Sequence, residues 1–330
     1  MSVKIELQKT IEDMVRPGKG ILAADESAPT IKKRFSAIDV ESNEETRRSY
    51  RSMLLSTPGL GAAISGVILF EETLKQKDDK GVAMPVASQC AGIVVGIKVD
   101  KGLVELPGSG GEKVTQGLDG LEERLAAYKA LGARFAKWRC VYQIHRGTVS
   151  SRAIEANAEV LARYAACCQA VGIVPIVEPE VLIDGEHDIA VCAKITEAVQ
   201  RAVFNALYRH QVAPEYILLK PSMVLPGTLG PQVSAAQIGE ATLAVLKRAV
   251  PAAVPSINFL SGGLTPEQAT ANLCAINKTG GTNPWLLSFS YGRALQEPVL
   301  GAWRGDSANC EAAQNALMLR AQLNANAVCG

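Results

Sequence analysis

The sequence lacks the features that mark several classes of protein. Its 34 basic side chains nearly balance 33 acidic ones, so it has neither the basic surface that binds nucleic acid nor an acidic tail. A membrane-spanning helix needs about 20 consecutive apolar residues, and the apolar runs here have only the length of strands. We therefore expect neither nucleic acid nor a membrane among its partners.

Cysteine and histidine are arranged in ways that exclude other common chemistry. None of the 8 cysteines forms a CxxC pair, and the amino-terminal residues mix charges with apolar side chains, unlike a secretory signal. We expect reduced thiols in the cytoplasm, although a mature plastid protein would show the same features. The three histidines, His145, His187 and His210, form no HxH or HExxH motif. Because a catalytic zinc site generally uses three protein ligands, we expect no metal.

Eight short segments rich in Ile, Val, Leu or Phe have the pattern of buried strands. The runs are continuous rather than alternating, which is typical of parallel strands covered on both faces. The predicted strands are Gly20–Glu26, Gly66–Glu72, Ile93–Asp100, Arg134–Tyr142, Ile173–Val181, Tyr216–Val224, Pro255–Gly262 and Trp285–Tyr291. Amphipathic patterns between most of them predict helices at Gly120–Leu131, Ser151–Val171, His187–His210, Val233–Ala249 and Thr265–Lys278.

This order of elements predicts an α/β fold, a (β/α)8 TIM barrel. No linker rich in Gly, Ser or Pro interrupts the chain, so residues 1–330 are expected to form a single domain. A C-terminal helical extension at about 307–328 is polar and rich in alanine, and we expect it to pack on the outside. A doubly wound open sheet is the alternative to the barrel.

Charged residues stand at the ends of the predicted strands, where barrels build their active sites. Four of them, from four different strands, point to one shared site: Asp25, Lys137, Glu178 and Lys220. Successive side chains on a strand point to opposite faces, so Lys137 and Arg139 share one face, as do Glu178 and Glu180. This convergence carries more weight than any single residue.

Lys220 follows three apolar residues and precedes Pro221, which keeps it extended and its stem in the apolar interior. A buried ammonium is unfavourable unless it is paired or loses its proton. A second cation nearby, such as Lys137, would favour the neutral amine that Schiff-base chemistry requires. A structural ion pair explains the same pattern, and the residues alone leave both interpretations open.

Two glycine-containing loops follow the last two predicted strands. They are Ser261-Gly262-Gly263 and Gly292-Arg293. Barrels often bind phosphate with these two loops, because backbone N–H groups without side chains can approach the anion. Ordinary turns between strand and helix are the alternative. The stretch 108–111 lacks a flanking strand and helix in the right order and is interpreted as a mobile loop.

Seven motifs at these strand ends identify a family. GILAADES, GIKVDKG, FAKWRCV, PIVEPE, LLKP, FLSGG and SFSYGRALQ occur in order between Gly20 and Gln296. Together they resemble the class I (Schiff-base) fructose-1,6-bisphosphate aldolase family. The resemblance implies reversible cleavage of fructose 1,6-bisphosphate to dihydroxyacetone phosphate and glyceraldehyde 3-phosphate, in glycolysis or gluconeogenesis. It also implies a homotetramer that uses no cofactor.

The resemblance implies roles for five charged residues. Lys220 is similar to the lysine that forms the imine with the C2 ketone, and Glu178 to the carboxylate that moves protons during imine formation. Asp25 resembles the base at the C4 hydroxyl, and Lys137 the cation that assists it. Glu180 matches a second, supporting carboxylate of the family.

The resemblance also implies binding residues for both phosphates. The C1-phosphate site would comprise Ser261, Gly262, Gly292 and Arg293. The hexose chain and the C6 phosphate would be held by Ser27, Thr30, Arg34, Lys98 and Arg139. Thr30 stands where several family members have serine, and it keeps the hydroxyl. Family chains usually continue into a mobile tail ending in tyrosine, which is absent or truncated in a sequence that ends Cys329-Gly330.

Two other functions compete with this interpretation. A metal-dependent aldolase or a phosphosugar isomerase could use the same scaffold, but histidine is scarce. A barrel that has lost catalysis could serve as a binding scaffold, since a fold alone does not secure a function. The presence of every charged strand-end residue argues against that alternative.

Overall fold

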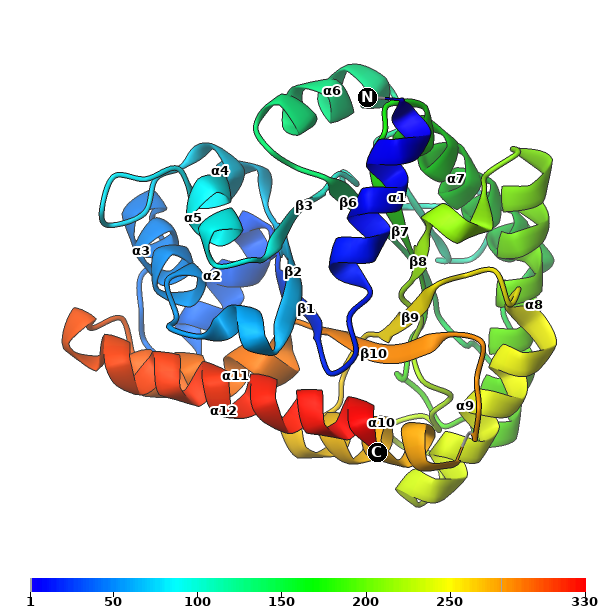
Figure 1. Ribbon diagram of the computed structural model, residues 1–330. Coiled ribbons are helices and arrows are strands. Elements are labelled where there is room, and N and C mark those ends of the chain that lie inside the picture. Colours follow the sequence, from blue (N-terminus) through cyan, green and yellow to red (C-terminus); the bar gives the residue numbers. More distant parts are fainter. Residues whose placement is uncertain (1, 280) are drawn as a thin grey trace.

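A closed barrel of eight parallel strands forms the centre of the computed structural model, which describes residues 2–279 and 281–330 (Figure 1). The strands are β1 (Gly20–Ala24), β2 (Ile64–Leu69), β3 (Val94–Lys98), β6 (Phe135–Tyr142), β7 (Val174–Val181), β8 (Leu218–Leu219), β9 (Ser256–Phe259) and β10 (Leu286–Tyr291). Their order around the barrel is β1-β10-β9-β8-β7-β6-β3-β2, and β2 pairs with β1 to close it. The closed barrel is confirmed and the open sheet is excluded.

All eight predicted strands are present, but several are shorter than predicted. β1 ends at Ala24 rather than Glu26, and β8 comprises only two residues. The Lys220 backbone N–H still donates to Val177 O at 2.8 Å, but Pro221 has no N–H with which to continue the ladder. β8 therefore ends just before Lys220, and Pro221 stops the strand from continuing.

The five predicted helices are also present, as α6 (Leu121–Ala130), α7 (Ser151–Ala170), α8 (Ile189–Arg209), α9 (Ala235–Ala249) and α10 (Pro266–Thr279). α8 begins two residues after the predicted start, because the Asp188 carboxylate accepts a 2.8 Å hydrogen bond from Val191 N and caps the helix. The sequence interpretation did not assign α1 (Val3–Met14), α2 (Ala28–Ser36), α3 (Glu44–Leu55), α4 (Glu71–Lys75), α5 (Met84–Cys90) or α11 (Arg293–Trp303).

α1 lies across the amino end of the barrel (Figure 1). Leu7, Ile11 and Met14 of α1 pack on Phe135 and other side chains of the lower barrel interior. Gly96 on β3 makes room for the Phe135 ring, since a Cβ there would lie 2.1 Å from a ring carbon. α1 thus packs at the amino end of the barrel, opposite the carboxyl ends of the strands where barrels build their active sites.

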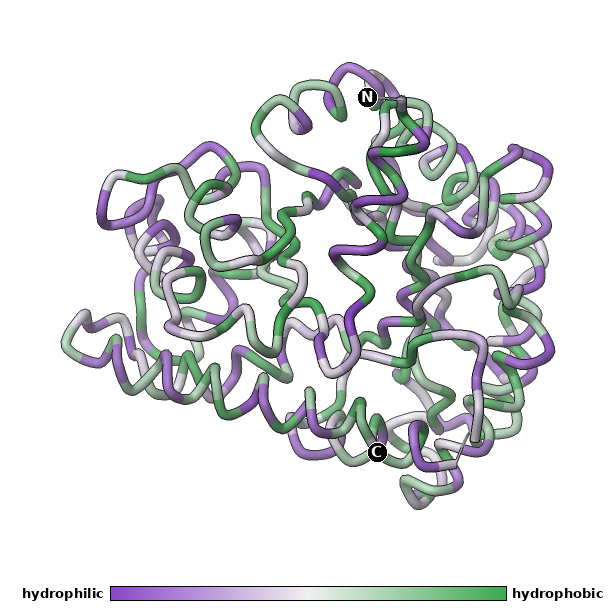
Figure 2. Tube along the Cα trace, in the orientation of Figure 1, coloured by the Kyte–Doolittle hydropathy of each residue, from purple (hydrophilic) through white to green (hydrophobic). Residues whose placement is uncertain are grey.

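A larger core surrounds the barrel, between the strands and the helices, and the hydrophobic residues follow the strands (Figure 2). The expected C-terminal extension is a 3-10 turn, η3 (Ser307–Asn309), followed by α12 (Cys310–Cys329), which packs against α10 and α11. Its buried face includes Ala313 and Leu317, while Leu319 is exposed. The expected outside position of this helix is confirmed (Figure 1).

The glycine-rich stretch 108–111 connects a hairpin that the sequence did not predict. β4 (Leu103–Glu105) and β5 (Lys113–Thr115) pair antiparallel outside the barrel. The Thr115 hydroxyl donates to Arg139 O at 2.8 Å, which ties the hairpin to β6.

In the part of the chain that the structure describes, we find no helix with the length and apolar character needed to cross a bilayer.

Candidate active site

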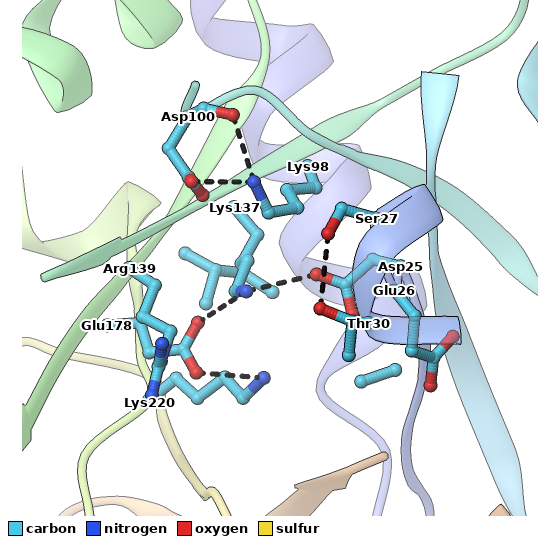
Figure 3. Close-up of polar contacts among 12 residues, drawn as sticks. Asp25, Glu26, Ser27, Thr30, Lys98, Asp100, Lys137, Arg139, Glu178 and Lys220 are labelled. Carbon is cyan, nitrogen blue, oxygen red and sulfur yellow. Dashed lines mark hydrogen bonds and ion pairs between the residues drawn. The ribbon is translucent and has the colours of Figure 1, made fainter. Parts of the chain in front are cut away.

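Four charged side chains meet inside the carboxyl end of the barrel (Figure 3). Lys137 Nζ donates to Asp25 Oδ2 at 3.0 Å and lies 3.0 Å from Glu178 Oε2. The other Glu178 oxygen, Oε1, lies 3.2 Å from Lys220 Nζ. The result is a row of alternating charges, Asp25–Lys137–Glu178–Lys220, which we call the charge row. The structure thus brings together the four residues on which the sequence prediction depended.

The barrel topology explains this arrangement. Lys137 and Glu178 lie on the neighbouring strands β6 and β7, and Lys220 directly follows β8, the next strand. Asp25 follows β1, which is not adjacent to any of these strands. The contact between Asp25 and Lys137 therefore crosses the barrel interior.

The charge row is largely shielded from water. Lys137, Glu178 and Lys220 are only 5%, 3% and 4% exposed. Charges at this depth are stable only when they are paired. Burial alone would raise the pKa of Asp25, but the ammonium groups of Lys137 and Lys220 hold it well below its usual range. Asp25 is therefore ionised at neutral pH.

Lys137 is a permanent cation in this setting. Burial alone would lower the pKa of its ammonium, but the carboxylates of Asp25 and Glu178 raise that pKa well above the usual value. Lys137 therefore keeps its proton at neutral pH. It can stabilise negative charge that develops beside it, but it does not serve as a base.

Glu180, two residues beyond Glu178, has a different environment. Its Oε2 accepts a 2.5 Å hydrogen bond from Arg139 Nε. Its Oε1 would lie 2.6 Å from a Cβ on Gly262, so the carboxylate packs directly against the loop after β9. Glu180 thus joins Arg139 to that loop and lies outside the charge row.

The loops after β9 and β10 are those for which the sequence predicts a phosphate site. Ser261 is buried beside Gly262, and Arg293 is the exposed first residue of α11, whose amino end has no side-chain cap. Arg34 Nη2 would lie 3.8 Å from a Cβ on Gly292. The sequence interpretation grouped Arg34 with the hexose chain and the C6 phosphate, whereas the structure places it beside the loop after β10.

Of the remaining predicted binding residues, Ser27 and Thr30 lie next to Asp25, and Arg139 lies beside Glu178 (Figure 3). Ser27 Oγ and Thr30 Oγ1 are 3.1 Å apart at the start of α2. Lys98 Nζ donates to Asp100 Oδ1 at 2.6 Å and to the Asp100 carbonyl at 2.9 Å. Asp100 was not among the predicted site residues, although it stands in the GIKVDKG motif.

Sequence reasoning also missed a polar cluster behind Asp25. The Glu26 carboxylate is buried and accepts hydrogen bonds from Arg51 at 2.7 Å, from Gln296 at 2.8 Å and from Arg34. Tyr50 OH donates to Gln296 Oε1 at 3.1 Å. Glu26 lies within the GILAADES motif, but no motif marked Arg51 on α3.

The side chains gathered here suit anions and proton transfer. They offer ammonium, guanidinium and hydroxyl donors together with carboxylates. Over residues 2–279 and 281–330, no group of three or more His, Cys, Asp or Glu side chains could hold a metal ion.

Comparison with known proteins gives consistent matches along the chain. The family model described as fructose-bisphosphate aldolase class-I matches residues 6–330. Fructose-bisphosphate aldolase C of Homo sapiens is 54% identical over 329 residues, which cover 99% of this chain and 90% of that protein. The Drosophila melanogaster fructose-bisphosphate aldolase is 53% identical over 326 residues, 98% of this chain and 90% of the relative.

A plant relative and a solved structure agree with these matches. Fructose-bisphosphate aldolase 4, cytosolic, of Arabidopsis thaliana is 53% identical over 315 residues, 95% of this chain and 80% of the relative. A crystal structure of the Plasmodium falciparum fructose-bisphosphate aldolase, in complex with TRAP and a small-molecule inhibitor, superposes with a TM-score of 0.97. It is 50% identical and covers 99% of this chain and 94% of that one.

Proposed function

The chain belongs to the class I fructose-bisphosphate aldolase family, and we propose from this premise that it cleaves fructose 1,6-bisphosphate through an imine on Lys220. The products are dihydroxyacetone phosphate and glyceraldehyde 3-phosphate, and the reaction is reversible, as glycolysis and gluconeogenesis require. The observation that carries the proposal is the charge row. In it Lys137 lies between the carboxylates of Asp25 and Glu178, and Glu178 also contacts Lys220.

Imine formation is assigned to Lys220 and Glu178. Lys220 first gives up its ammonium proton and then adds as an amine to the C2 carbonyl, and the resulting carbinolamine loses water to give a protonated imine. Glu178 Oε1 lies 3.2 Å from Lys220 Nζ, within reach to take a proton from the nitrogen and return it to the departing hydroxyl. After cleavage, C3 takes up a proton to restore the imine, and the same steps in reverse then release dihydroxyacetone phosphate by hydrolysis.

Carbon–carbon cleavage is assigned to Asp25 and Lys137. The ionised Asp25 carboxylate accepts the proton of the C4 hydroxyl as the C3–C4 bond breaks. The bonding electrons flow into the protonated imine, which becomes an enamine, and the C4 fragment leaves as an aldehyde. Lys137, 3.0 Å from Asp25, stabilises the negative charge that develops on the C4 oxygen.

The two phosphates of the substrate need a cationic or N–H-rich site at each end. For the C1 phosphate we propose Ser261, Gly262, Gly292 and Arg293. For the hexose chain and the C6 phosphate we propose Ser27, Thr30, Lys98 and Arg139. The closeness of Arg34 to Gly292 supports placing Arg34 with the C1 phosphate. Glu180 acts indirectly, because it holds Arg139 and contacts the loop at Gly262.

The domain count, the oligomeric state and the cellular location are proposals that do not depend on the site. We propose that residues 1–330 form one domain, since the eight strands of the barrel include both the first strand, β1, and the last, β10. The family resemblance supports a homotetramer, for which light scattering should give about four times the 34.9 kDa of one chain. Two Arabidopsis relatives are named cytosolic, which supports a cytosolic location.

Steady-state assays of the purified chain test the proposed function. Cleavage of fructose 1,6-bisphosphate should be abolished in Lys220→Met, which keeps the length of the buried stem without the amine. Lys75→Met, which removes an exposed lysine paired with Glu71, is the control and should keep full activity. Activity that is lost in EDTA and restored by zinc would contradict the imine mechanism.

A further inference from the structure

Behind the reacting groups, Arg51 holds the turn that carries Asp25. Arg51 lies on α3, and its Nη2 donates to the Glu26 carboxylate at 2.7 Å and to the Glu26 backbone carbonyl at 3.3 Å. Its Nη1 donates to Thr73 Oγ1 on α4 at 3.1 Å. One guanidinium therefore contacts both the side chain and the main chain of Glu26, the residue after Asp25.

This ion pair is fully enclosed by the core. The side chains of Arg51 and Glu26 are only 3% and 4% exposed. Relative to apolar side chains of similar volume, a buried ion pair often contributes little net stability. Its hydrogen bonds, in contrast, fix the direction and distance of the groups that they join.

Asp25 and Glu26 point in opposite directions from the same short turn (Figure 3). Asp25 points into the barrel toward Lys137, and Glu26 points out toward α3 and α11. Because the two residues share a peptide unit, a shift or rotation of Glu26 moves the Asp25 carboxylate. The Asp25–Lys137 contact crosses the barrel, so it depends on the placement of this turn.

Gln296 anchors the same turn from α11. Its Nε2 donates to Glu26 Oε1 at 2.8 Å and to Ala23 O at 2.7 Å, and Tyr50 OH donates to its Oε1. Of these groups, Arg51 is the one whose charge balances Glu26 deep in the core. Arg34, the other cation on Glu26, is 22% exposed and lies at the edge of the site.

We propose that Arg51 is a positioning residue for carbon–carbon cleavage, holding Glu26 so that the Asp25 carboxylate stays against Lys137. Arg51 contacts none of the groups assigned to the chemistry, and it acts through Glu26 and the backbone. The proposal rests on the proposed role of Asp25. The proposal predicts that a change at Arg51 slows carbon–carbon cleavage but not imine formation, because imine formation on Lys220 does not use this turn.

Two variants test the proposal without leaving an unpaired charge in the core. Arg51→Lys keeps the charge but loses the two-pronged contact, and the double variant Glu26→Gln/Arg51→Gln removes both charges together. In each, the kcat of cleavage should fall about tenfold to a hundredfold, as expected when a reacting group is displaced by about 1 Å. The rate at which borohydride traps the imine should change less than about twofold in both variants. KM should also change less than about twofold in Arg51→Lys, whereas Glu26→Gln in the double variant additionally releases Arg34.

Arg47→Lys is the matched control. Arg47 lies on the same helix and makes two hydrogen bonds to Glu72, at 2.8 and 2.6 Å, away from Asp25. Its cleavage rate should equal that of the wild type. A comparable loss in Arg47→Lys would mean that any disturbance of α3 slows the enzyme, and it would overturn the assignment to Arg51.

A mutant cycle with Asp25→Asn provides the decisive readout. If Arg51 acts through Asp25, then Arg51→Lys should not slow single-turnover cleavage further in the Asp25→Asn background. Losses that multiply, or an Arg51→Lys variant that folds and cleaves at the wild-type rate, would overturn the proposal. If Asp25→Asn alone cleaves normally, it is the proposed role of Asp25 that fails, and that single variant shows it.

Discussion

Lys137 donates a 3.0 Å hydrogen bond to Asp25 across the interior of the barrel, although β6 and β1 are not neighbouring strands. The same ammonium lies 3.0 Å from Glu178. One cation therefore stands between two carboxylates, and it helps to keep the pKa of Asp25 well below its usual range in a buried site. In the proposed mechanism each carboxylate serves a different stage of the reaction, Glu178 at the imine and Asp25 at the C4 hydroxyl.

The two carboxylates should fail in different ways when neutralised. Asp25→Asn should form the imine at the wild-type rate but lose cleavage, because the amide cannot accept the C4 proton. Glu178→Gln should instead slow the appearance of the imine. Loss of general acid–base assistance typically lowers a rate by about 10²- to 10⁴-fold. Rapid-quench trapping measures the rate of imine formation, and steady-state assays measure the rate of cleavage. If Asp25→Asn formed no imine while Glu178→Gln formed it at the normal rate, the two roles would have to be exchanged.

Arg293 should matter for any ketose 1-phosphate. Loss of a charge-assisted hydrogen bond costs about 1.5–3 kcal/mol, or roughly 10- to 150-fold in affinity. Arg293→Ala should therefore raise KM for both fructose 1,6-bisphosphate and fructose 1-phosphate, and Ser261→Ala should do so in the same direction. Arg304→Ala, at the other end of α11, is the control. A defect with the bisphosphate alone would place Arg293 at the C6 end.

Gly262 should tolerate no side chain. A Cβ there would lie 2.6 Å from Glu180 Oε1 and 2.9 Å from Leu260 Cδ1, and Glu180 cannot move freely because Arg139 holds it. Gly262→Ala should therefore displace the loop after β9 and raise KM for fructose 1-phosphate. Gly301→Ala inside α11 meets no neighbouring atom and should slightly stabilise the helix, by about 0.5–1 kcal/mol. Unchanged kinetics in Gly262→Ala would remove this loop from the phosphate site.

The charge row should also shape the dependence of stability on pH. The pKa of Asp25 is lowered on folding by Lys137 and Lys220 against the effect of burial. Its contribution to the free energy of unfolding is thus present above the unfolded pKa and is lost as the pH falls toward the folded one. Urea unfolding of the wild type and Asp25→Asn should show a constant difference between about pH 5 and 8, which shrinks below about pH 4. A difference that already shrinks between about pH 7 and 5 would contradict the lowered pKa.

Much of the barrel could be predicted because buried parallel strands are continuous apolar runs, as in β7, where every residue is buried. α3 could not, since its sequence EETRRSYRSMLL is polar and its buried face includes Arg51 and Ser52. A buried arginine breaks the apolar periodicity that reveals a helix. The β4–β5 hairpin was missed because its strands are only three residues long and the apolar residues of β4, such as Leu103, are exposed.

Part of the site could be predicted, because a parallel barrel brings the side chains at the carboxyl ends of its strands close together. Alternation along β6 and β7 predicts which side chains face the interior, and the structure brings Lys137 and Glu178 together. The contact of Asp25 with Lys137 depends on closure of the sheet, which brings distant strands face to face. The pairing of Glu26 with Arg51 joins a strand end to a helix 25 residues away, and no local pattern encodes such a contact.

The most direct test of the mechanism is to find the lysine that becomes covalently attached to substrate. The protein would be incubated with dihydroxyacetone phosphate, reduced with borohydride and digested, and the modified peptide sequenced by mass spectrometry, with EDTA present in a parallel sample. We predict one triose-phosphate adduct, on Lys220, formed equally with and without EDTA and absent when borohydride is quenched before the ketone is added. An adduct on Lys137 or another lysine, or none in a preparation that cleaves fructose 1,6-bisphosphate, would contradict the imine mechanism at Lys220.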